Sequence, residues 1–384
     1  MTSSRTLLVT PRTPRVSEAW LLSHAEAIRD NVVATATYEK GGTSWFHGRP
    51  NADLGHSLAL NRYGVGRLTR LRARALPAEV ERLEPTGAVV HYANLYDLLS
   101  PPSGPLTDLP TVVYVHGFDI TWSPFRWCPI PYKNMGNTAA YRRRLIGYSE
   151  HVLYIANSEF SRNRMIDSGF PPERVRVCYL PVERTTPQVT RDPQAAGRID
   201  LAFLGRFVGC KGPLQVIQAV EIARRGGADV NLTMIGDGPL FGQAEHLVSQ
   251  LSLGDSVNLL GAIPNQSAMQ HLAKSDALVL HNRTDERTGQ VEAFGYAHAE
   301  ALAHGVPVLT GASGGPTEFL SHGRNSMLVD PGDVDSQAEQ MLNLAFDIDL
   351  RDELAAGAEH SSKEMFSASA HRAVITAALD EVGR

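Results

Sequence analysis

Short apolar runs alternate with segments of helical periodicity along most of the chain. The runs are rich in Val, Ile and Leu and are bounded by Gly, Pro, Asn or Asp, which is typical of buried parallel strands. Helical periodicity separates them, for example over Leu214–Arg225, Ala268–Ser275 and Tyr296–Ala303. This repeated order predicts an α/β fold of doubly wound parallel sheets. The predicted strands are Thr6–Thr10, Val89–Tyr92, Thr111–His116, Val152–Asn157, Leu201–Leu204, Val230–Ile235, Ala277–His281 and Val306–Thr310.

One polar segment interrupts the alternation. Residues 183–199, ERTTPQVTRDPQAAGRI, contain two prolines and have no hydrophobic period, so we interpret them as a linker. The linker separates a first lobe, residues 1–182, from a second lobe, residues 200–365, and each is large enough for its own parallel sheet. Two Rossmann-like lobes leave a cleft that the carboxyl ends of the strands face, and we expect a ligand there.

Composition narrows the class of protein. Of the 384 residues, 43% are hydrophobic and 20% are charged, which is a globular composition that excludes disorder, collagen and coiled coil. The formal net charge of −5 gives no reason to expect nucleic acid as a partner. The three cysteines are widely spaced and suit a reducing compartment, and no apolar stretch approaches the ~18 residues of a membrane span. We therefore expect a soluble, cytoplasmic protein.

The first candidate for chemistry is the loop after the predicted strand Leu201–Leu204. Gly205-Arg206 ends that strand, and Lys211-Gly212 opens the next helix. Two cations five residues apart at a helix N-terminus can bind a diphosphate, because the free N–H groups of the helix add partial positive charge. Taken alone, the loop also fits two solvated surface cations.

The second candidate is the segment VEAFGYAHAEALAHGVPVLTG, which starts at residue 291. Glu292 precedes the Phe294-Gly295 turn, and Glu300 lies two turns into the helix that follows. A glycine at the turn lets backbone N–H groups approach an anion, and Glu300 could accept hydrogen bonds from the vicinal hydroxyls of a ribose. Taken alone, two glutamates on a helix are more typical of a solvated face.

Together these elements resemble the nucleotide-sugar lobe of the retaining glycosyltransferases of family 4, also called glycosyl transferases group 1. Members of that family have the GT-B fold, with two Rossmann-like lobes and a cleft. Their pattern is a strand with Gly-Arg, then Lys-Gly, then two glutamates with seven residues between them, then a G-x-P-V strand. This sequence has the same pattern at Gly205-Arg206, Lys211-Gly212, Glu292, Glu300 and Gly305-Val306-Pro307-Val308.

The first half of the chain resembles the same family at fewer positions. The strand TVVYVHGFD ends in His116, which is similar to a histidine that contacts the donor. SEAWLLSHAEAI, from residue 17, departs from the family by standing where many relatives have a Gly-Gly loop. Ala293 replaces a glycine, which requires a negative φ. The resemblance also implies that the last helix, within residues 366–384, packs back on the first lobe.

The resemblance implies a retaining transfer of a sugar from a UDP- or GDP-linked donor to an acceptor hydroxyl. Glu300 would bind the ribose, and Glu292 and His116 the donor sugar. Because charge develops on the leaving diphosphate, cations and N–H groups there should supply the main catalytic effect, without a cofactor or a metal ion. The residues assigned to catalysis are His116, Arg206, Lys211 and Glu292, and those assigned to donor binding are Gly205, Arg206, Lys211, Phe294, Gly295 and Glu300.

The acceptor has no readable signature. Sugar, lipid-linked and small-molecule acceptors all fit, in polysaccharide, glycolipid or secondary-metabolite biosynthesis. Five arginines between Arg62 and Arg74 occur without an acidic residue among them. Such a run is typical of a solvated helix face, and its alternative is peripheral docking on anionic lipid at the inner face of the membrane.

Other patterns fit the chain less well. Gly311–Gly315 matches the G-x-S-x-G elbow of hydrolases, but only one strand follows it, too few for the other triad residues. Gly236-Asp237-Gly238 with Gly242 lacks the spacing of a dinucleotide fingerprint. The D-x-D patterns at 333–335 and 347–349 resemble metal sites, but we interpret the first as a helix N-cap and the second as part of a charged helix. Two alternatives stay open: another GT-B enzyme such as a nucleotide-sugar epimerase, and a non-catalytic nucleotide-sugar-binding subunit.

Overall fold

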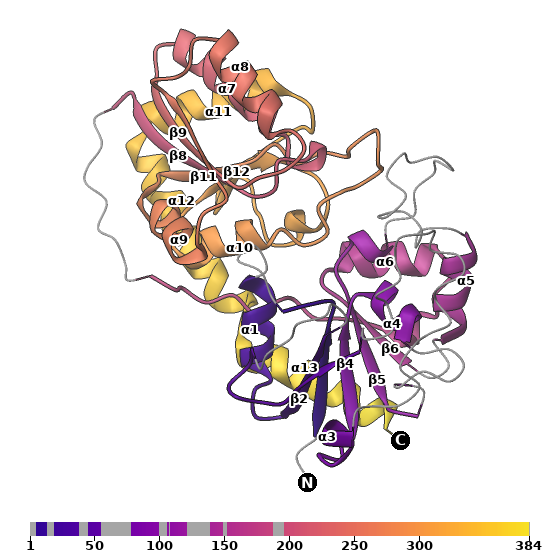
Figure 1. The fold of residues 1–384 in the computed structure, drawn as a ribbon. Coiled ribbons are helices and arrows are strands. Elements are labelled where there is room, and N and C mark those ends of the chain that lie inside the picture. The colour runs from indigo at the N-terminus through magenta and orange to yellow at the C-terminus, as the bar shows by residue number, and fades with distance from the viewer. Residues whose placement is uncertain are drawn as a thin grey trace. The chain divides into compact units, whose positions relative to one another are not determined.

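The computed structural model describes residues 5–13, 19–37, 45–54, 78–99, 106, 108–120, 139–148, 152–186 and 196–383. The chain divides into two compact units (Figure 1). The first consists of Met1–Pro181 with Ala368–Arg384, and the second of Val182–Ser367. The basic segment 62–74 and Cys128 lie outside the described residues, so the predicted role of that segment stays a prediction.

A parallel sheet of seven strands forms the core of the described part of the first unit, in the order β3-β2-β1-β4-β5-β6-β7. Residues in β1, β4, β5 and β6 are buried at every position, because helices cover both faces of the sheet. The strands are β1 (Thr6–Thr10), β2 (Val32–Thr37), β3 (Asn51–Asp53), β4 (Gly87–His91), β5 (Thr111–Val115), β6 (Val152–Ala156) and β7 (Val175–Val177).

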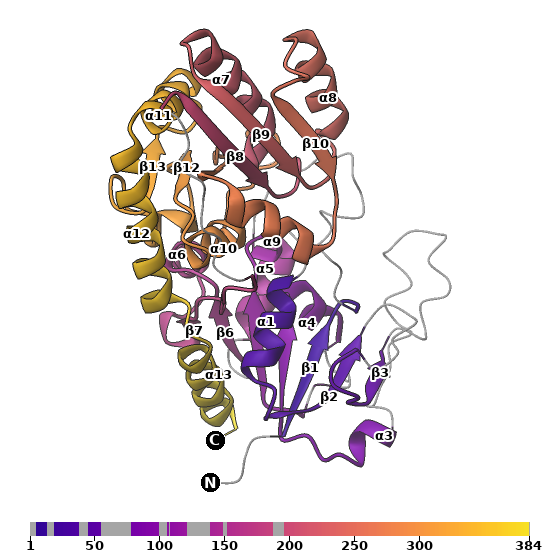
Figure 2. The same cartoon turned by 90° about the vertical axis from the view of Figure 1, so that its left-hand side faces the viewer.

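Helices pack on both sides of this sheet. On one side α13 contacts α1 and β5, and on the other α4 contacts β4, β5 and α5 (Figure 2). The helix α13 therefore joins the end of the chain to its beginning within this unit. The described helices are α1 (Ala19–Ala27), α3 (Ala78–Glu81), α4 (Ala93–Leu99), α5 (Ala139–Tyr148), α6 (Glu159–Asp167) and α13 (Ala368–Val382).

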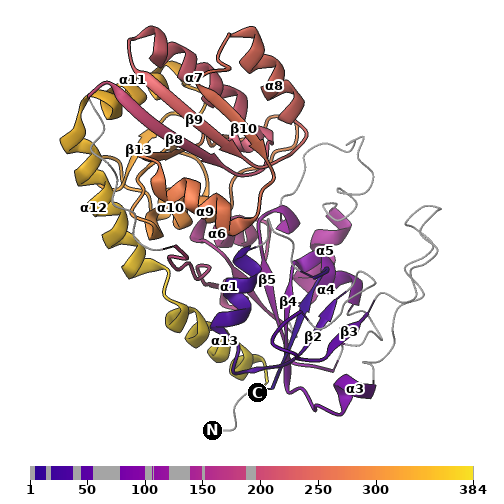
Figure 3. The ribbon, with the colours of Figure 1, turned by 60° about the vertical axis from the view of Figure 1, so that its left-hand side comes forward.

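The second unit has a parallel sheet of six strands in the order β10-β9-β8-β11-β12-β13. Helices α7 and α11 pack together on one face, and α9 and α10 contact the strands from the other (Figure 3). The strands are β8 (Arg198–Leu204), β9 (Asp229–Ile235), β10 (Val257–Gly261), β11 (Ala277–Val279), β12 (Val308–Gly311) and β13 (Ser326–Val329). The helices are α7 (Pro213–Arg225), α8 (Phe241–Gln250), α9 (Asn265–Lys274), α10 (Tyr296–Ala303), α11 (Val334–Phe346) and α12 (Ile348–Met365).

Both sheets confirm the predicted doubly wound fold. In each, strand order reverses beside the first strand of the unit, between β1 and β4 and between β8 and β11. Ligands of such sheets bind at this reversal, at the carboxyl ends of the strands. Among the described residues, no helix combines the length and the apolar content that crossing a membrane requires.

Candidate functional site

The loop that carries the predicted cations is held at the strand reversal of the second unit. After β8 ends at Leu204, residues 209–211 form a 3₁₀ turn and Gly212 caps the start of α7. Gly212 has a φ of 60°, and a Cβ there would lie 2.5 Å from the carbonyl oxygen of His281, just after β11. Only glycine permits that approach, so Gly212 lets the loop after β8 pack against the residues that follow β11.

Lys211 meets Glu292 at this position. Its Nζ lies 2.5 Å from Oε2 of Glu292, and the two side chains are only 13% and 16% exposed. The other carboxylate oxygen, Oε1, accepts a hydrogen bond of 3.0 Å from the N–H of Gly295. A Cβ at Gly205 would lie 3.6 Å from Cε of Lys211. Four predicted site residues, which are up to 90 positions apart in the sequence, therefore lie together.

The surroundings of Glu292 favour the ionised form of its carboxylate. Burial raises the pKa of Glu292, but Lys211 and the Gly295 N–H lower it more, so the net pKa lies below its usual range. Glu292 is therefore ionised at neutral pH. Burial, with Lys211, lowers the pKa of the nearby His298 to about 3, so that ring is neutral. In this structure Lys211 and the Gly295 N–H hold the Glu292 carboxylate, and a cation beside backbone N–H donors is also a combination that binds phosphate.

The start of α10 is shaped for close approach of the backbone. Gly295 has a φ of 86° and caps the helix without a side-chain hydrogen bond. A Cβ there would lie 2.5 Å from Nδ1 of His298 and 2.7 Å from Cγ of Pro316. Phe294 points into the core, where its ring packs on Phe319 with centroids 5.5 Å apart. The Phe294 side chain therefore anchors the turn, and the predicted donor contact through its backbone N–H stays a prediction.

Ala293 has the negative φ that the sequence analysis requires of an alanine at this position. The described non-glycine residues with positive φ do not include it, so its methyl group causes no strain there.

Glu300 is buried in the second turn of α10. It is 9% exposed. Burial raises its pKa to about 8, although a hydrogen bond with Asn265 and the charge of Lys211 act in the opposite direction. Asn265 is the first residue of α9. Glu300 thus keeps its proton at neutral pH in this environment, and hydroxyl groups that donate to it would favour its ionised form.

Arg206 differs from Lys211. It follows Gly205 on the same loop, but its side chain is exposed, and it makes no ion pair with the described residues. The structure places it at the strand reversal and does not bring it into the Lys211–Glu292 group.

His116 lies in the first unit, directly after β5. Its ring nitrogen Nε2 lies 2.9 Å from Nδ1 of His91, and its backbone N–H donates to Oδ1 of Asp119 at 2.9 Å. Asp119 also accepts the N–H of Ala93 at the start of α4. Burial raises the pKa of Asp119 to about 6, against the N–H donors of Ala93 and His116. Sequence reasoning missed His91 and Asp119, although a polar residue that ends a buried strand, as His91 does, is a usable signal.

The two D-x-D patterns are helix caps. Asp333 accepts the N–H of Ser336 at the start of α11, as predicted. Asp347 accepts the N–H of Leu350 and caps α12, and Asp349 lies in the first turn of that helix, which agrees with the interpretation of 347–349 as part of a charged helix. Within the described part of the chain, no group of three or more His, Cys, Asp or Glu side chains is arranged to hold a metal ion.

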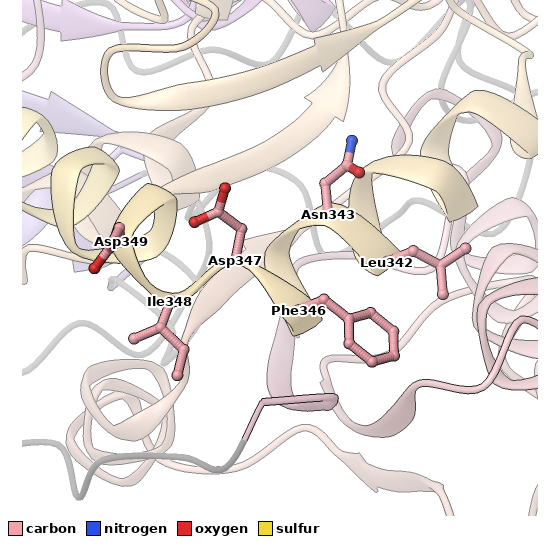
Figure 4. Close-up of a pocket in the computed structure, with 6 residues that line it drawn as sticks. All are labelled: Leu342, Asn343, Phe346, Asp347, Ile348 and Asp349. Carbon is pink, nitrogen blue, oxygen red and sulfur yellow. The ribbon is translucent and has the colours of Figure 1, made fainter.

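A surface pocket of about 590 Å³ lies at the junction of α11 and α12 (Figure 4). None of the predicted site residues lines it. The lining residues are Leu342, Asn343, Phe346, Asp347, Ile348 and Asp349.

Comparison with known proteins shows which family the second unit is similar to. Residues 190–361 match the model described as Glycosyl transferases group 1. This match covers most of the second unit of the chain. The match covers the β8 loop and both glutamates, and it confirms the resemblance predicted from the motifs.

The curated relatives that the chain matches are distant. The chain is 28% identical over 235 residues to the GDP-mannose-dependent alpha-(1-6)-phosphatidylinositol monomannoside mannosyltransferase of Mycolicibacterium smegmatis, covering 59% of this chain and 58% of that protein. It is 25% identical over 198 residues to the amylovoran biosynthesis glycosyltransferase AmsK of Erwinia amylovora, covering 52% of this chain and 48% of that protein. The chain thus spans about three fifths of the length of the curated mannosyltransferases it matches.

One solved structure shows the fold of nearly the whole chain. Anabaena Alr3699/HepE, crystallised in complex with UDP and glucose, superposes with a TM-score of 0.73 at 19% identity, covering 98% of this chain and 99% of that one. This likeness confirms the predicted GT-B class of fold.

Proposed function

We propose that this protein is a retaining glycosyltransferase that moves a sugar from a nucleoside-diphosphate sugar to an acceptor hydroxyl. The observation that carries the proposal is the meeting of Lys211, Glu292 and the Gly295 N–H at the strand reversal of the second unit. A cation and the N-termini of α7 and α10 are the groups that a diphosphate needs. The match of residues 190–361 to the glycosyl transferases group 1 supports the same assignment.

In this proposal Lys211 and Arg206 bind the diphosphate, and Gly205 and Gly295 allow it to approach the backbone. Glu300 binds the ribose hydroxyls, and Glu292 and His116 contact the donor sugar. The bond from the anomeric carbon to the phosphate oxygen breaks, and the acceptor oxygen bonds to the same face of that carbon. The acceptor proton passes to a phosphate oxygen, so no enzyme nucleophile is required. Positive charge near the leaving diphosphate lowers the barrier most.

The donor and acceptor classes come from the relatives. The Mycolicibacterium relative is named for GDP-mannose and a phosphatidylinositol monomannoside, and AmsK for amylovoran biosynthesis. The Anabaena structure contains UDP and glucose. We therefore propose a UDP- or GDP-linked hexose as donor and a glycolipid or polysaccharide intermediate as acceptor.

The test is a donor panel. The purified protein is incubated with UDP-glucose, UDP-galactose, UDP-N-acetylglucosamine and GDP-mannose, each with mannosylated phosphatidylinositol and with oligosaccharide acceptors. Release of the nucleoside diphosphate and a mass increase of one hexosyl or acetylhexosaminyl unit on the acceptor are expected for one donor. The anomeric ¹H–¹³C coupling of the product should match that of the donor, since the transfer retains configuration.

The alternatives give different results. An epimerase converts a nucleotide sugar without any acceptor, which product analysis in the absence of acceptor detects. A non-catalytic subunit binds nucleotide sugar and leaves it intact. Lys211→Ala serves as the control, because it should slow release of the nucleoside diphosphate ~10²-fold without unfolding the protein.

A further inference from the structure

Four histidines of the first unit form one cluster, which we call the imidazole cluster: His24, His91, His116 and His371. They come from α1, the end of β4, the residue after β5, and α13. His24, His91 and His371 are 0–2% exposed. Segments from both ends of the chain therefore contribute to one buried group of rings around His116.

Two hydrogen-bonded pairs make up the imidazole cluster. Nδ1 of His91 lies 2.9 Å from Nε2 of His116. Nδ1 of His24 lies 2.7 Å from Nε2 of His371. The pairs meet edge to face, with the ring centroids of His24 and His91 4.4 Å apart at an angle of 88°. The ring of His91 is thus packed between His116 and a second, independent pair.

The second pair has a defined protonation pattern. Nδ1 of His371 lies 2.8 Å from the carbonyl oxygen of Tyr179, which can only accept a hydrogen bond. Nδ1 of His371 therefore carries the hydrogen, its Nε2 accepts, and His24 donates from Nδ1. The rings of this pair therefore have fixed orientations, and His24 packs against the ring of His91.

The surroundings of His116 restrict its ring further. Its centroid lies 4.2 Å from that of Trp20 and 4.7 Å from that of Tyr92. Tyr92 has a φ of 76°, a left-handed conformation that is costly for a residue with a side chain. Such strain persists where the surrounding structure requires it, and it occurs often at functional sites. The backbone of His116 is held separately, by its N–H bond to Asp119.

We propose that His91 is a positioning residue for His116: their 2.9 Å hydrogen bond sets the ring orientation and the tautomer of His116. The inference rests on the proposed function, which assigns His116 to the donor sugar. Nε2 of His91 is buried without a hydrogen-bond partner in the described part of the chain, and a bare nitrogen is tolerated there better than an orphaned N–H. His91 therefore carries its hydrogen on Nδ1 and donates it to Nε2 of His116, which leaves the hydrogen of His116 on Nδ1. A rotated ring would leave Nδ1 of His91 unpaired. Because Nε2 of His91 already has no hydrogen-bond partner in the described part of the chain, that loss would be costly.

The test uses three variants. His91→Asn keeps a hydrogen-bonding group near the position of Nδ1, whereas His91→Phe keeps a ring and removes the bond. Tyr114→Phe is the matched control. It removes the buried hydrogen bond from the Tyr114 hydroxyl to the carbonyl of Cys178 in the same core, and it leaves the pair of His91 and His116 intact.

The first readout is spectroscopic and independent of activity. Long-range ¹H–¹⁵N correlation spectra of the 14 histidine rings, with His116 assigned through His116→Gln, should show a single tautomer for His116 in the wild type. His91→Phe should move both ring nitrogens of His116 toward the averaged positions of a tautomer mixture. His91→Asn and Tyr114→Phe should preserve the wild-type signals. A tautomer mixture at His116 in the folded wild type would overturn the proposal without any variant.

The second readout is kinetic. His91→Phe should lower kcat about 10-fold, while KM and nucleoside diphosphate affinity change less than about 2-fold, since a misplaced group affects the transition state most. His91→Asn should restore kcat to within about 3-fold of the wild type. Equal losses in His91→Phe and Tyr114→Phe would show general core damage and contradict positioning. If the wild type transfers no sugar from any donor, the proposed function fails, and the spectra still decide the role of His91.

Discussion

At the scale of single residues, the Glu292 carboxylate organises the candidate site. One of its oxygens contacts Lys211 and the other contacts the N–H of Gly295. These two partners are a cation and a helix N-terminus, the combination that binds phosphate oxygens in other α/β proteins. The chemistry proposed for the site therefore depends on a few side chains whose removal can be measured.

Removing the cations should slow the reaction strongly. Lys211→Ala and Arg206→Ala should each lower kcat/KM ~10²-fold, because each loses a charge-assisted bond to the leaving diphosphate worth ~3 kcal/mol. Steady-state kinetics on variants shown to be folded by circular dichroism measure this. Arg225→Ala is the control, since that exposed guanidinium pairs with Glu221 at the end of α7, and it should change kcat/KM less than about 2-fold. Near-normal kinetics of folded Lys211→Ala would remove Lys211 from the diphosphate site.

Glu300 should couple nucleotide binding to pH. Burial raises its pKa to about 8, so the free protein keeps this proton at neutral pH. Ribose hydroxyls that donate to the carboxylate stabilise its ionised form, so binding should release up to ~1 proton at pH 7 and tighten as the pH rises toward 8. Calorimetry in two buffers of different ionisation enthalpy measures the release. Glu300→Gln should abolish it, whereas Glu292→Ala should leave nucleotide affinity nearly unchanged. Proton-independent binding to the wild type would contradict the ribose assignment.

At the scale of elements, α13 ties the C-terminal end of the chain to the first unit. His371 of α13 bonds to His24 of α1, and Arg372 donates to the carbonyl of Ala27 and pairs with Asp30. Burial lowers the pKa of His371 to about 4. The packing of α13 thus depends on a ring that must stay neutral.

Acid should weaken the first unit through this contact. The unfolded state binds a proton on His371 below its ordinary pKa of about 6.5, whereas the folded state does so only near pH 4. The stabilisation is therefore complete above pH 6.5 and is lost as the pH falls toward 4. His371→Asn should flatten the pH dependence of the unfolding free energy in this window by up to ~1.4 kcal/mol per pH unit. Calorimetric unfolding at pH 7, 6 and 5 compares the two proteins, and identical slopes would exclude His371 as the source.

Secondary structure followed from the sequence where strands are continuously apolar. All eight predicted strands correspond to strands of the two sheets. Buried central strands such as TVVYV are recognisable because they are short, continuously apolar and rich in β-branched residues. The edge strands β3 (NAD) and β10 (VNLLG), and the strand β2 (VVATAT), were missed. β3 is too short and polar to show a period, and small Ala and Thr residues weaken the apolar signal of β2.

At the scale of the whole molecule, the sequence predicted the two parts of the candidate site unequally. In the second unit, Lys211 and Glu292 could be assigned to one donor site in advance, because the motif spacing carries the family resemblance, but their ion pair was not predicted. The imidazole cluster could not be predicted. Its members His24, His91 and His371 are scattered over most of the chain, and each taken alone is an ordinary histidine in a helix or strand. Only the folded first unit brings them to His116.

Activity should not depend on a metal ion. About two positive charges neutralise a diphosphate. Arg206 and Lys211 supply them if Lys211 exchanges its Glu292 partner for a phosphate oxygen, and the N-termini of α7 and α10 add partial charge. Transfer should therefore survive excess EDTA, with at most a few-fold stimulation by Mg²⁺ through faster product release. A sugar-transfer assay with and without chelator measures this. Complete loss of activity with EDTA, restored by Mn²⁺ or Mg²⁺, would show that the charge balance is wrong.

The crystal structure of the protein with UDP or GDP tests the central claim most directly. We expect the diphosphate within hydrogen-bond distance of Nζ of Lys211 and close to the backbone of the loop after β8, and the ribose hydroxyls on the Glu300 carboxylate. A nucleotide bound elsewhere in the second unit, or one whose ribose makes no contact with Glu300, would contradict the claim.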